Sequence, residues 1–253
     1  MKGIRLAFAF LTVLPVSRDG ELPVASSRAW FPFVGLALGA VLVGLDALLR
    51  MGLPDLLVGA LLVAAMLITT RALHTEGFLD CCDGLFGGYA AEDRLRILRD
   101  THVGAFAVIG GVAMLMTKWS LLASTPDEAR IGLLLVFPCL ARFGMLATMA
   151  LFPYARKDGL GSSFQSDQSW WHVVLGATTA ALATVLFLGG AGFILLGSAL
   201  LAAILLGKWM SSWLGGMTGD AYGAVNELCE VVVLILGVAL IPIIPDAFQA
   251  PLW

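Results

Sequence analysis

Charged side chains are scarce in this chain of 253 residues, since Asp, Glu, Lys and Arg make up 13% of it and hydrophobic residues 59%. Its mean hydropathy is +0.92. A soluble globular domain carries about 25% charged residues, so the composition excludes an ordinary soluble domain. Apolar runs of about 20 residues recur along the chain, which is typical of a helical integral membrane protein.

Cysteine is also sparse. The four cysteines are Cys81, Cys82, Cys139 and Cys229, and no two of them have a C-x₂-C spacing. Neighbouring Cys81 and Cys82 would form only a strained disulfide with each other. A zinc site that combined them with His74 would lack the usual ligand spacing. We therefore expect all four to be small, polarisable packing residues in apolar surroundings.

Hydropathy predicts one all-α, polytopic integral membrane domain over residues 1–253, with about seven transmembrane helices. The predicted spans are 30–49, 55–73, 104–123, 131–152, 171–188, 191–210 and 228–244. Of the 15 Lys and Arg residues, eleven fall in segments on the side of the amino terminus and two on the other side. The positive-inside rule then predicts a cytoplasmic amino terminus, cytoplasmic motif loops and a place in the cytoplasmic (inner) membrane.

The stretch 74–102 is an acidic segment between two spans, with six carboxylates within 25 residues. On a helix, Glu76, Asp80 and Asp83 would share one face, because they stand at positions i, i+4 and i+7. Like charges on one face repel, so the pattern indicates a bound cation, and oxygen ligands favour Mg²⁺ or Mn²⁺. A solvated acidic loop is the alternative. Three glycines follow that would let the backbone approach a phosphate-bearing ligand, namely Gly84, Gly87 and Gly88.

A second polar stretch, 213–230, contains Asp220, Asn226 and Glu227 and is predicted to be a loop. It would complete the first cluster, either with metal ligands or with groups that bind a substrate hydroxyl or amide. Helix capping is the alternative for its carboxylates. Arg142 lies within a predicted span, where an ionisable group faces a partner or a polar cavity. It is expected either to pair with a buried acid or to bind a substrate phosphate.

Asp100 and His102 precede the third predicted span, and either could take a proton from a hydroxyl nucleophile. A residue of the membrane interface with no role as a base is the alternative for His102. Arg94 either balances the nearby acids or contacts substrate. Arg156 either anchors the positive side of the membrane or binds a phosphate, since glycines and serines follow it. Carboxylates, a divalent metal, glycine turns and arginines at a membrane surface together favour metal-assisted phosphoryl-group transfer.

Four blocks in order along the chain resemble one known family. They are FLTVLPV at the start, His74-x-Glu76-Gly-Phe-Leu-Asp80-x-x-Asp83-Gly-Leu-Phe-Gly-Gly with Arg94 and Asp100 after it, Tyr154-Ala-Arg156 with Gly159-Leu-Gly161, and Gly215-Gly216-Met-Thr218-Gly219-Asp220-x-x-Gly223-Ala-x-Asn226-Glu227. This pattern strongly resembles the cobalamin synthase family of adenosylcobinamide-GDP ribazoletransferases. The likeness runs over nearly the whole chain.

The resemblance implies a reaction in which α-ribazole, or its 5′-phosphate, brings a ribose hydroxyl to the phosphorus attached to cobinamide, and GMP leaves. It implies Mg²⁺ on Glu76, Asp80 and Asp83, with Asp100 as a ligand or base. Asp83, Asp100 and His102 are the expected catalytic residues, although family members usually carry Asp in place of Glu76 and Arg in place of His102. The expected substrate-binding residues are His74, Gly84, Gly87, Gly88, Arg94, Arg142, Arg156, Asp220, Asn226 and Glu227. Expected partners are adenosylcobinamide-GDP, α-ribazole and membrane lipid, with no nucleic acid, and a homo-oligomer is left open.

Two other functions fit part of the pattern. Asp80-x-x-Asp83-Gly84 is also similar to the opening of the CDP-alcohol phosphotransferase signature, but the rest of that signature does not follow. This argues against phospholipid synthesis. A cation-coupled transporter would use its acids as an ion path near the midplane of the membrane. Against it, the predicted spans hold almost no acids besides Asp46.

Overall fold

The computed structural model describes residues 2–15, 24–155 and 169–250. No strand occurs within these ranges, so the all-α prediction is confirmed there. The α-helices are α1 (Lys2–Leu11), α2 (Val24–Ser27), α3 (Phe31–Leu49), α4 (Asp55–Thr70), α5 (Leu73–Gly87), α6 (Ala91–Ile97), α7 (Ala105–Ala123), α8 (Arg130–Leu151), α10 (Trp170–Leu188), α11 (Gly192–Leu214) and α12 (Gly219–Leu240). Short 3₁₀ turns are η1 (Arg28–Trp30), η2 (Asp127–Ala129) and η3 (Pro245–Phe248).

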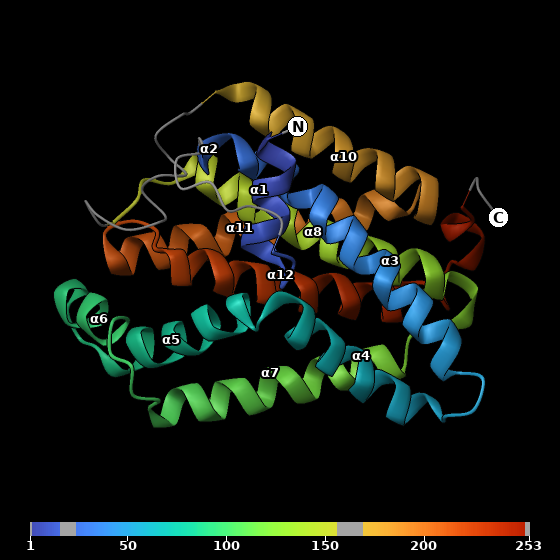
Figure 1. Cartoon of the computed structure of the whole chain (residues 1–253), viewed down its shortest axis with the longest axis horizontal. Coiled ribbons are helices and arrows are strands. Elements are labelled where there is room, and N and C mark those ends of the chain that lie inside the picture. The colour runs from blue at the N-terminus through green and yellow to red at the C-terminus, as the bar shows by residue number, and fades with distance from the viewer. Residues whose placement is uncertain (1, 16–23, 156–168, 251–253) are drawn as a thin grey trace.

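Within the described ranges, six helices are long and apolar enough to cross a membrane, namely α3, α7, α8, α10, α11 and α12. Helices α4 and α5 meet that condition only as a pair, and they bend by 94° at the break between them. Figure 1 shows α4 starting at one end of the bundle and α5 ending at the other, beside α6. If the pair is one broken span, the bundle has up to seven, which agrees with the predicted number.

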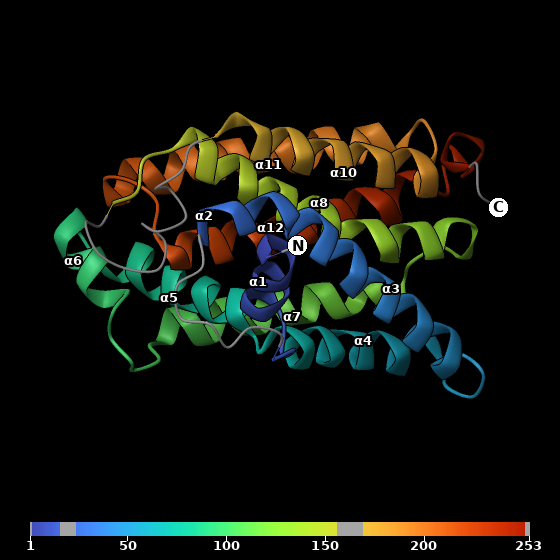
Figure 2. The ribbon, with the colours of Figure 1, turned by 45° about the horizontal axis from the view of Figure 1, so that its top comes forward.

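Helix α8 is the centre of the bundle, since 89% of its spanning window is buried against 28% for α7 and α11. In Figures 1 and 2, α8 and α12 lie between α10 and α11 on one side and α4, α5 and α7 on the other. Helix α3 approaches α8 through two small residues spaced four apart. A Cβ atom at Gly35 would lie 2.4 Å from the Pro138 oxygen, and one at Gly39 would lie 2.4 Å from the Leu135 oxygen. Such close backbone contact is how membrane helices pack without large side chains.

The break between α4 and α5 carries backbone strain. Arg71 and Ala72 are both in the left-handed region, with φ of 55° and 52°. That conformation costs about 1 to 2 kcal/mol for each residue that is not glycine. Helix α1 packs at this point, because the Arg71 guanidinium donates to the Ala9 oxygen at 3.2 Å. The Val13 N–H also donates to the Thr69 oxygen at 2.8 Å, so the amino-terminal segment is fixed to the break.

Two segments that the sequence predicts as loops are helical. The stretch 74–102 holds α6 and all of α5 after Leu73, and the predicted helical register of its first three acids is confirmed. The stretch 213–230 is wrong as a loop, because α12 begins at Gly219, and its end at Leu240 corrects the predicted span 228–244. Hydropathy did not predict where α5 and α12 begin, because it treats every polar side chain as facing water. Many polar side chains of these two helices are buried.

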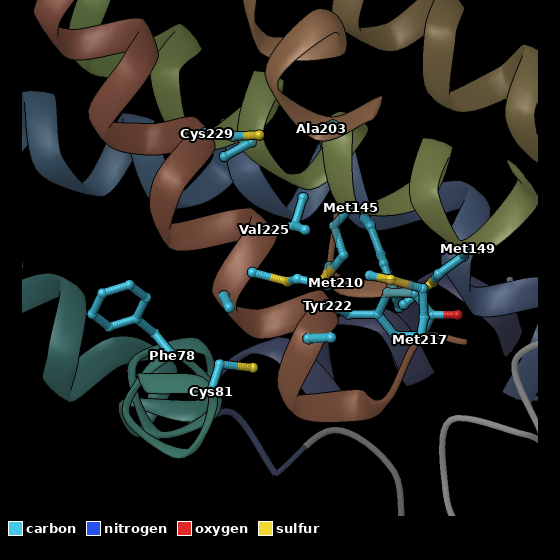
Figure 3. Close-up of a cluster of buried hydrophobic side chains, with 14 of the residues drawn as sticks. Phe78, Cys81, Met145, Met149, Ala203, Met210, Met217, Tyr222, Val225 and Cys229 are labelled. Carbon is cyan, nitrogen blue, oxygen red and sulfur yellow. The ribbon is translucent and has the colours of Figure 1, made fainter. Parts of the chain in front are cut away.

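A sulfur-rich core fills the space between α5, α8, α11 and α12. Figure 3 shows Met145, Met149, Met210 and Met217 gathered near Tyr222. Methionine adapts its shape to irregular gaps of this kind. The four cysteines are all buried and free, which confirms their predicted role as packing residues.

Candidate functional site

The carboxyl-terminal helix crosses the acidic helix at very short range. A Cβ atom at Gly77 of α5 would lie 2.8 Å from the backbone carbonyl oxygen of Asp220 in α12. A Cβ atom at Gly223 would lie 3.0 Å from the backbone carbonyl oxygen of His74. Both glycines belong to the blocks that resemble the known family. Their role is therefore to let the two blocks touch, which places Asp220 beside the start of the acidic face.

The three acids of that face lie in different environments. Glu76 is exposed, whereas Asp80 and Asp83 are half-buried. The Asp83 carboxylate accepts the Gly104 N–H at 2.6 Å and the Ala107 N–H at 2.9 Å, so it caps α7 from a neighbouring helix. A carboxylate has about four acceptor sites, so two of them remain for a metal or a substrate.

Two of the three glycines after the acids have a packing role. A Cβ atom at Gly84 would lie 2.8 Å from the Leu98 Cγ, and one at Gly88 would lie 2.6 Å from the Arg94 Cγ. The missing side chains of Gly84 and Gly88 leave space for the residues of α6 and for Leu98 after it, and not for a ligand. Gly87 has more open space around it. Arg94 itself donates to the Trp213 oxygen at 3.2 Å, and its guanidinium lies 4.4 Å from the centre of that indole ring. Arg94 thus ties α6 to the end of α11.

Asp100 and His102 form an exposed pair just before α7. The Asp100 carboxylate accepts the His102 backbone N–H at 3.0 Å and lies 2.7 Å from His102 Nδ1. These hydrogen bonds, first that of the side chain, lower the pKa of Asp100, which is therefore ionised near neutral pH. The Asp83–Gly104 hydrogen bond fixes the backbone two residues after His102, so the pair lies near the far end of the acidic face.

The third and fourth blocks are joined by backbone hydrogen bonds. The Met217 N–H donates to the Pro153 oxygen at 2.7 Å, and the Ala155 N–H donates to the Met217 oxygen at 2.8 Å. The turn before α12 uses Gly215 and Gly216 at φ of 75° and 150°, where a side chain would be strained. Arg156 lies outside the described residues.

A network of buried charges lies below this surface. It consists of two acids of α12, Glu227 and Glu230, with Lys118 of α7 and Arg142 of α8. Lys118 binds both acids, at 2.5 Å for Glu227, and Arg142 binds Glu230. Every one of these side chains is at most 8% exposed. With two cations and two anions the network is neutral, as a site within a membrane requires.

Three uncharged side chains complete this buried network. The Thr75 hydroxyl donates to Glu227 at 3.2 Å, and the Asn226 amide donates to Glu230 at 3.1 Å. His74 Nδ1 lies 3.4 Å from the Arg142 guanidinium. The sequence predicted His74, Asn226, Glu227 and Arg142 as substrate-binding residues, with a buried ion pair as the alternative for Arg142. The structure brings them together with their side chains turned to one another.

The sequence pattern gave Lys118 and Thr75 no predicted role, and it placed Glu230 in the polar stretch 213–230 as a member of that loop or a helix cap, with no buried partner. Lys118 lies inside the predicted span 104–123, where an ionisable group is expected to have a partner, and this signal could have found it. The membrane-spanning helices carry more acids than the sequence predicted, because Glu227 and Glu230 lie within α12 in addition to Asp46 in α3.

No three His, Cys, Asp or Glu side chains converge as a metal site in ranges 2–15, 24–155 and 169–250. The carboxylates of Glu76, Asp80 and Asp83 nevertheless share one face of α5, and their oxygen donors are of the kind that Mg²⁺ prefers. Asp100 lies beyond this face. The chemistry of the donor set thus fits a hard divalent cation.

Comparison with known proteins gives one consistent family. A model of the cobalamin-5-phosphate synthase family matches residues 3–238. The chain is 37% identical over 239 residues to an adenosylcobinamide-GDP ribazoletransferase of Geotalea daltonii, covering 93% of this chain and 96% of the relative. It is 36% identical to the protein of that name from Desulfitobacterium hafniense, over 93% and 96% of the two chains. The protein of that name from Chlorobaculum tepidum is 35% identical, over 93% and 94%. No solved structure matches the chain.

Proposed function

Since the chain belongs to the cobalamin-5-phosphate synthase family, it joins adenosylcobinamide-GDP with α-ribazole to make cobalamin, and we propose that it does so by metal-assisted phosphoryl-group transfer. The ribose hydroxyl of α-ribazole, or of its 5′-phosphate, forms a bond to the phosphorus attached to cobinamide. The bond from that phosphorus to the oxygen of GMP breaks, and the hydroxyl proton passes to a base.

The observation that carries this proposal is the meeting of the four blocks. The first block contacts the break before α5 through Val13. The second and fourth blocks cross at Gly77 and Gly223. The third and fourth are joined through Met217. The blocks, although spread over the whole chain, thus meet at or next to α5, and the three acids of α5 supply the oxygen ligands that a metal-assisted phosphoryl-transfer site needs.

We assign the metal to Glu76, Asp80 and Asp83, with Asp100 as a further ligand from the segment before α7. When bound, Mg²⁺ would neutralise the diphosphate and stabilise the leaving phosphate. Asp83 would also keep α7 in place through its two N–H contacts.

The Asp100–His102 pair is the proposed acceptor of the hydroxyl proton. The His102 Nδ1 faces the Asp100 carboxylate at 2.7 Å, an arrangement that orients the ring and leaves Nε2 to accept a proton. Asp100 is anionic at neutral pH, and hydrogen bonds from His102 lower its pKa further, which favours ligand or orienting roles for it over that of the base.

The bundle is proposed to lie in the cytoplasmic membrane with the acidic end of α5 on the cytoplasmic side. Figure 1 shows the end of α5, helix α6 and the start of α12 at one end of the bundle. Most Lys and Arg residues fall in segments assigned to that side, which supports a cytoplasmic position. Water-borne substrates would reach the acids there.

The test uses the full chain in liposomes with adenosylcobinamide-GDP and either α-ribazole or its 5′-phosphate. GMP and a corrinoid product that disappear with EDTA and return with Mg²⁺ are the expected result. Asp80→Asn should lower kcat by at least about 100-fold, because losing a ligand removes several kcal/mol of charge stabilisation. Asp93→Asn, in exposed helix α6, is the matched control and should keep normal turnover. Product that forms in the presence of EDTA would contradict the proposed metal dependence. CMP release from lipid substrates, with no GMP release from adenosylcobinamide-GDP, would contradict the proposed transfer reaction.

A further inference from the structure

The buried network adjoins the break between α4 and α5. A cavity of about 10 Å³, room for about one water molecule, is lined by Thr70 at the end of α4 and Thr75 in the first turn of α5. Lys118, Arg142 and both acids of the network line the same cavity. The four charges therefore face both sides of the break at once.

The first turn of α5 is held from two directions. Thr75 donates to Glu227 of α12, and His74 lies against Arg142 of α8. Lys118 of α7 then joins Glu227 to Glu230. These contacts come from three different spans.

The strain at the break requires such support. Two successive non-glycine residues in the left-handed region, Arg71 and Ala72, persist only where surrounding contacts over-determine them. The contacts of α1 fix the α4 side of the break through Arg71. On the α5 side, the first turn contacts the buried network through Thr75 and His74, and the His74 backbone also packs against Gly223 of α12.

Three buried polar atoms of this region have no hydrogen-bond partner among the described residues: His74 Nε2, Arg142 Nε and Asn226 Oδ1. All three side chains belong to the buried network or contact it, and Arg142 also lines the cavity that has room for a water molecule.

We propose that the buried network of Lys118, Arg142, Glu227 and Glu230 sets the angle between α4 and α5, and thereby positions the acidic face of α5 beside Asp220. These residues are positioning residues, because they act on the reaction through α5. The inference rests on the proposed function of that acidic face. A misplacement of about 1 Å can cost 100-fold in rate even when the chemistry is distant.

The test compares two charge-balanced double variants of the full chain in liposomes. Lys118→Met with Glu227→Met removes one cation, one anion and the acceptor of Thr75, and leaves the Arg142–Glu230 pair intact. The matched control is Asp46→Leu with Arg130→Met, which removes another buried pair at the far end of α3. Replacement of a buried pair by apolar residues is often nearly neutral for stability.

The first readout is a distance and needs no activity. Spin labels are placed at Ile68 on α4, which is 69% exposed, and at Tyr89 just beyond α5, which is 94% exposed. The native cysteines are buried, so the labels go to the introduced ones. We expect the distance distribution between the labels to shift or broaden in the Lys118/Glu227 variant and to stay unchanged in the control.

The second readout is kinetic. We expect kcat to fall about 100-fold in the Lys118/Glu227 variant while KM for both substrates changes little, with both constants normal in the control. An unchanged distance distribution and kcat in an active enzyme would overturn the inference. If the double variant does not fold, Thr75→Val decides in the same two readouts, since it removes only the Glu227 hydrogen bond. Absence of product from the wild-type chain would instead count against the proposed function, and the distance readout would still test the break.

Discussion

Helix α8 carries two buried arginines whose surroundings differ. Arg130, at the start of the helix, donates to both carboxylate oxygens of Asp46. Its Nε lies 2.9 Å from Oδ2, and its Nη2 lies 2.7 Å from Oδ1. Its remaining nitrogen donates to the Thr125 oxygen at 3.0 Å, so every nitrogen of this guanidinium has an acceptor. Arg142, in the middle of the helix, binds Glu230 within the buried network, and its Nε has no partner among the described residues.

The difference separates two uses of buried charge. The Asp46–Arg130 pair is complete in itself and joins α3 to α8 at the end of the bundle away from the acidic helix. The buried network extends over four helices and is incompletely paired. A complete pair can be replaced as a unit, whereas an extended network holds several elements in relation to one another.

The largest expected effect is that of Glu230→Gln. Glu230 accepts from Lys118, Arg142 and Asn226, and its neutralisation leaves two buried cations with one acid. Breaking buried pairs in this way costs about 3 to 5 kcal/mol. Thermal unfolding in detergent should show a large fall in Tm, with turnover lost. Glu128→Gln, on an exposed acid, is the control. Equal Tm values for the two variants would remove the distinction between network and surface.

Asp46→Asn should destabilise the protein by about 3 kcal/mol, because Arg130 then lacks its counter-charge. Turnover per folded molecule should remain normal. The double replacement Asp46→Leu with Arg130→Met should recover most of the lost stability. Denaturant unfolding and kcat measured on the same samples check both statements. A fall in kcat equal to that of the network variants would show that the two clusters do not differ.

Asn226→Leu tests an uncharged member of the network. It removes the hydrogen bond to Glu230 together with the unpartnered Oδ1, so the net loss of stability should be about 1 kcal/mol. We expect turnover to fall by more than the loss of folded protein explains, since Glu230 is less firmly held. Leu228→Met, on the same helix, is the control. Loss of turnover in proportion to folded protein would mean that Asn226 contributes stability alone.

The smallest effect on stability and turnover is expected for an exposed ion-pair cluster at the end of the bundle away from α5. Arg50 contacts Asp55 at 3.1 Å and Asp127 at 2.7 Å, and all three side chains are substantially exposed. Hydrogen bonding to Asp127 raises the pKa of Arg50, which stays charged at any working pH. Asp55→Asn should change the free energy of unfolding by less than about 1 kcal/mol and leave turnover unchanged. A change that grows at low salt and exceeds this amount would show that the surface pair, too, supports the bundle.

Much of the bundle follows from the sequence, because long apolar runs fix the spans and the spacing of Glu76, Asp80 and Asp83 fixes their helical face. The early start of α12 does not follow from hydropathy, which places Glu227 and Glu230 in water. Their partners, Lys118 and Arg142, lie about 100 residues away in the chain, so only the tertiary structure reveals that these charges are neutralised.

The break before α5 was also hidden from the sequence. Proline or glycine usually marks a sharp bend, but Arg71 and Ala72 are neither, and their left-handed conformation depends on contacts with other elements. Likewise, the motif glycines Gly84 and Gly88 were predicted to leave space for a ligand. In the structure they are packed against neighbouring residues of or beside α6. The spacing of glycines in a sequence does not distinguish space for a ligand from space for another helix.

The break has a consequence for how the chain enters the membrane. Helix α4 has 16 residues and is about 24 Å long, shorter than the hydrocarbon core of about 30 Å. If the bent pair is one span, α5 completes the crossing, and its polar first turn can contact Glu227 only after the last long helix is synthesised. We expect nascent chains that end before Gly219 to leave a cysteine at Thr75 open to a water-soluble thiol reagent, and full-length chains to protect it. The bent pair would then be the last crossing to settle, although it is among the first to be translated.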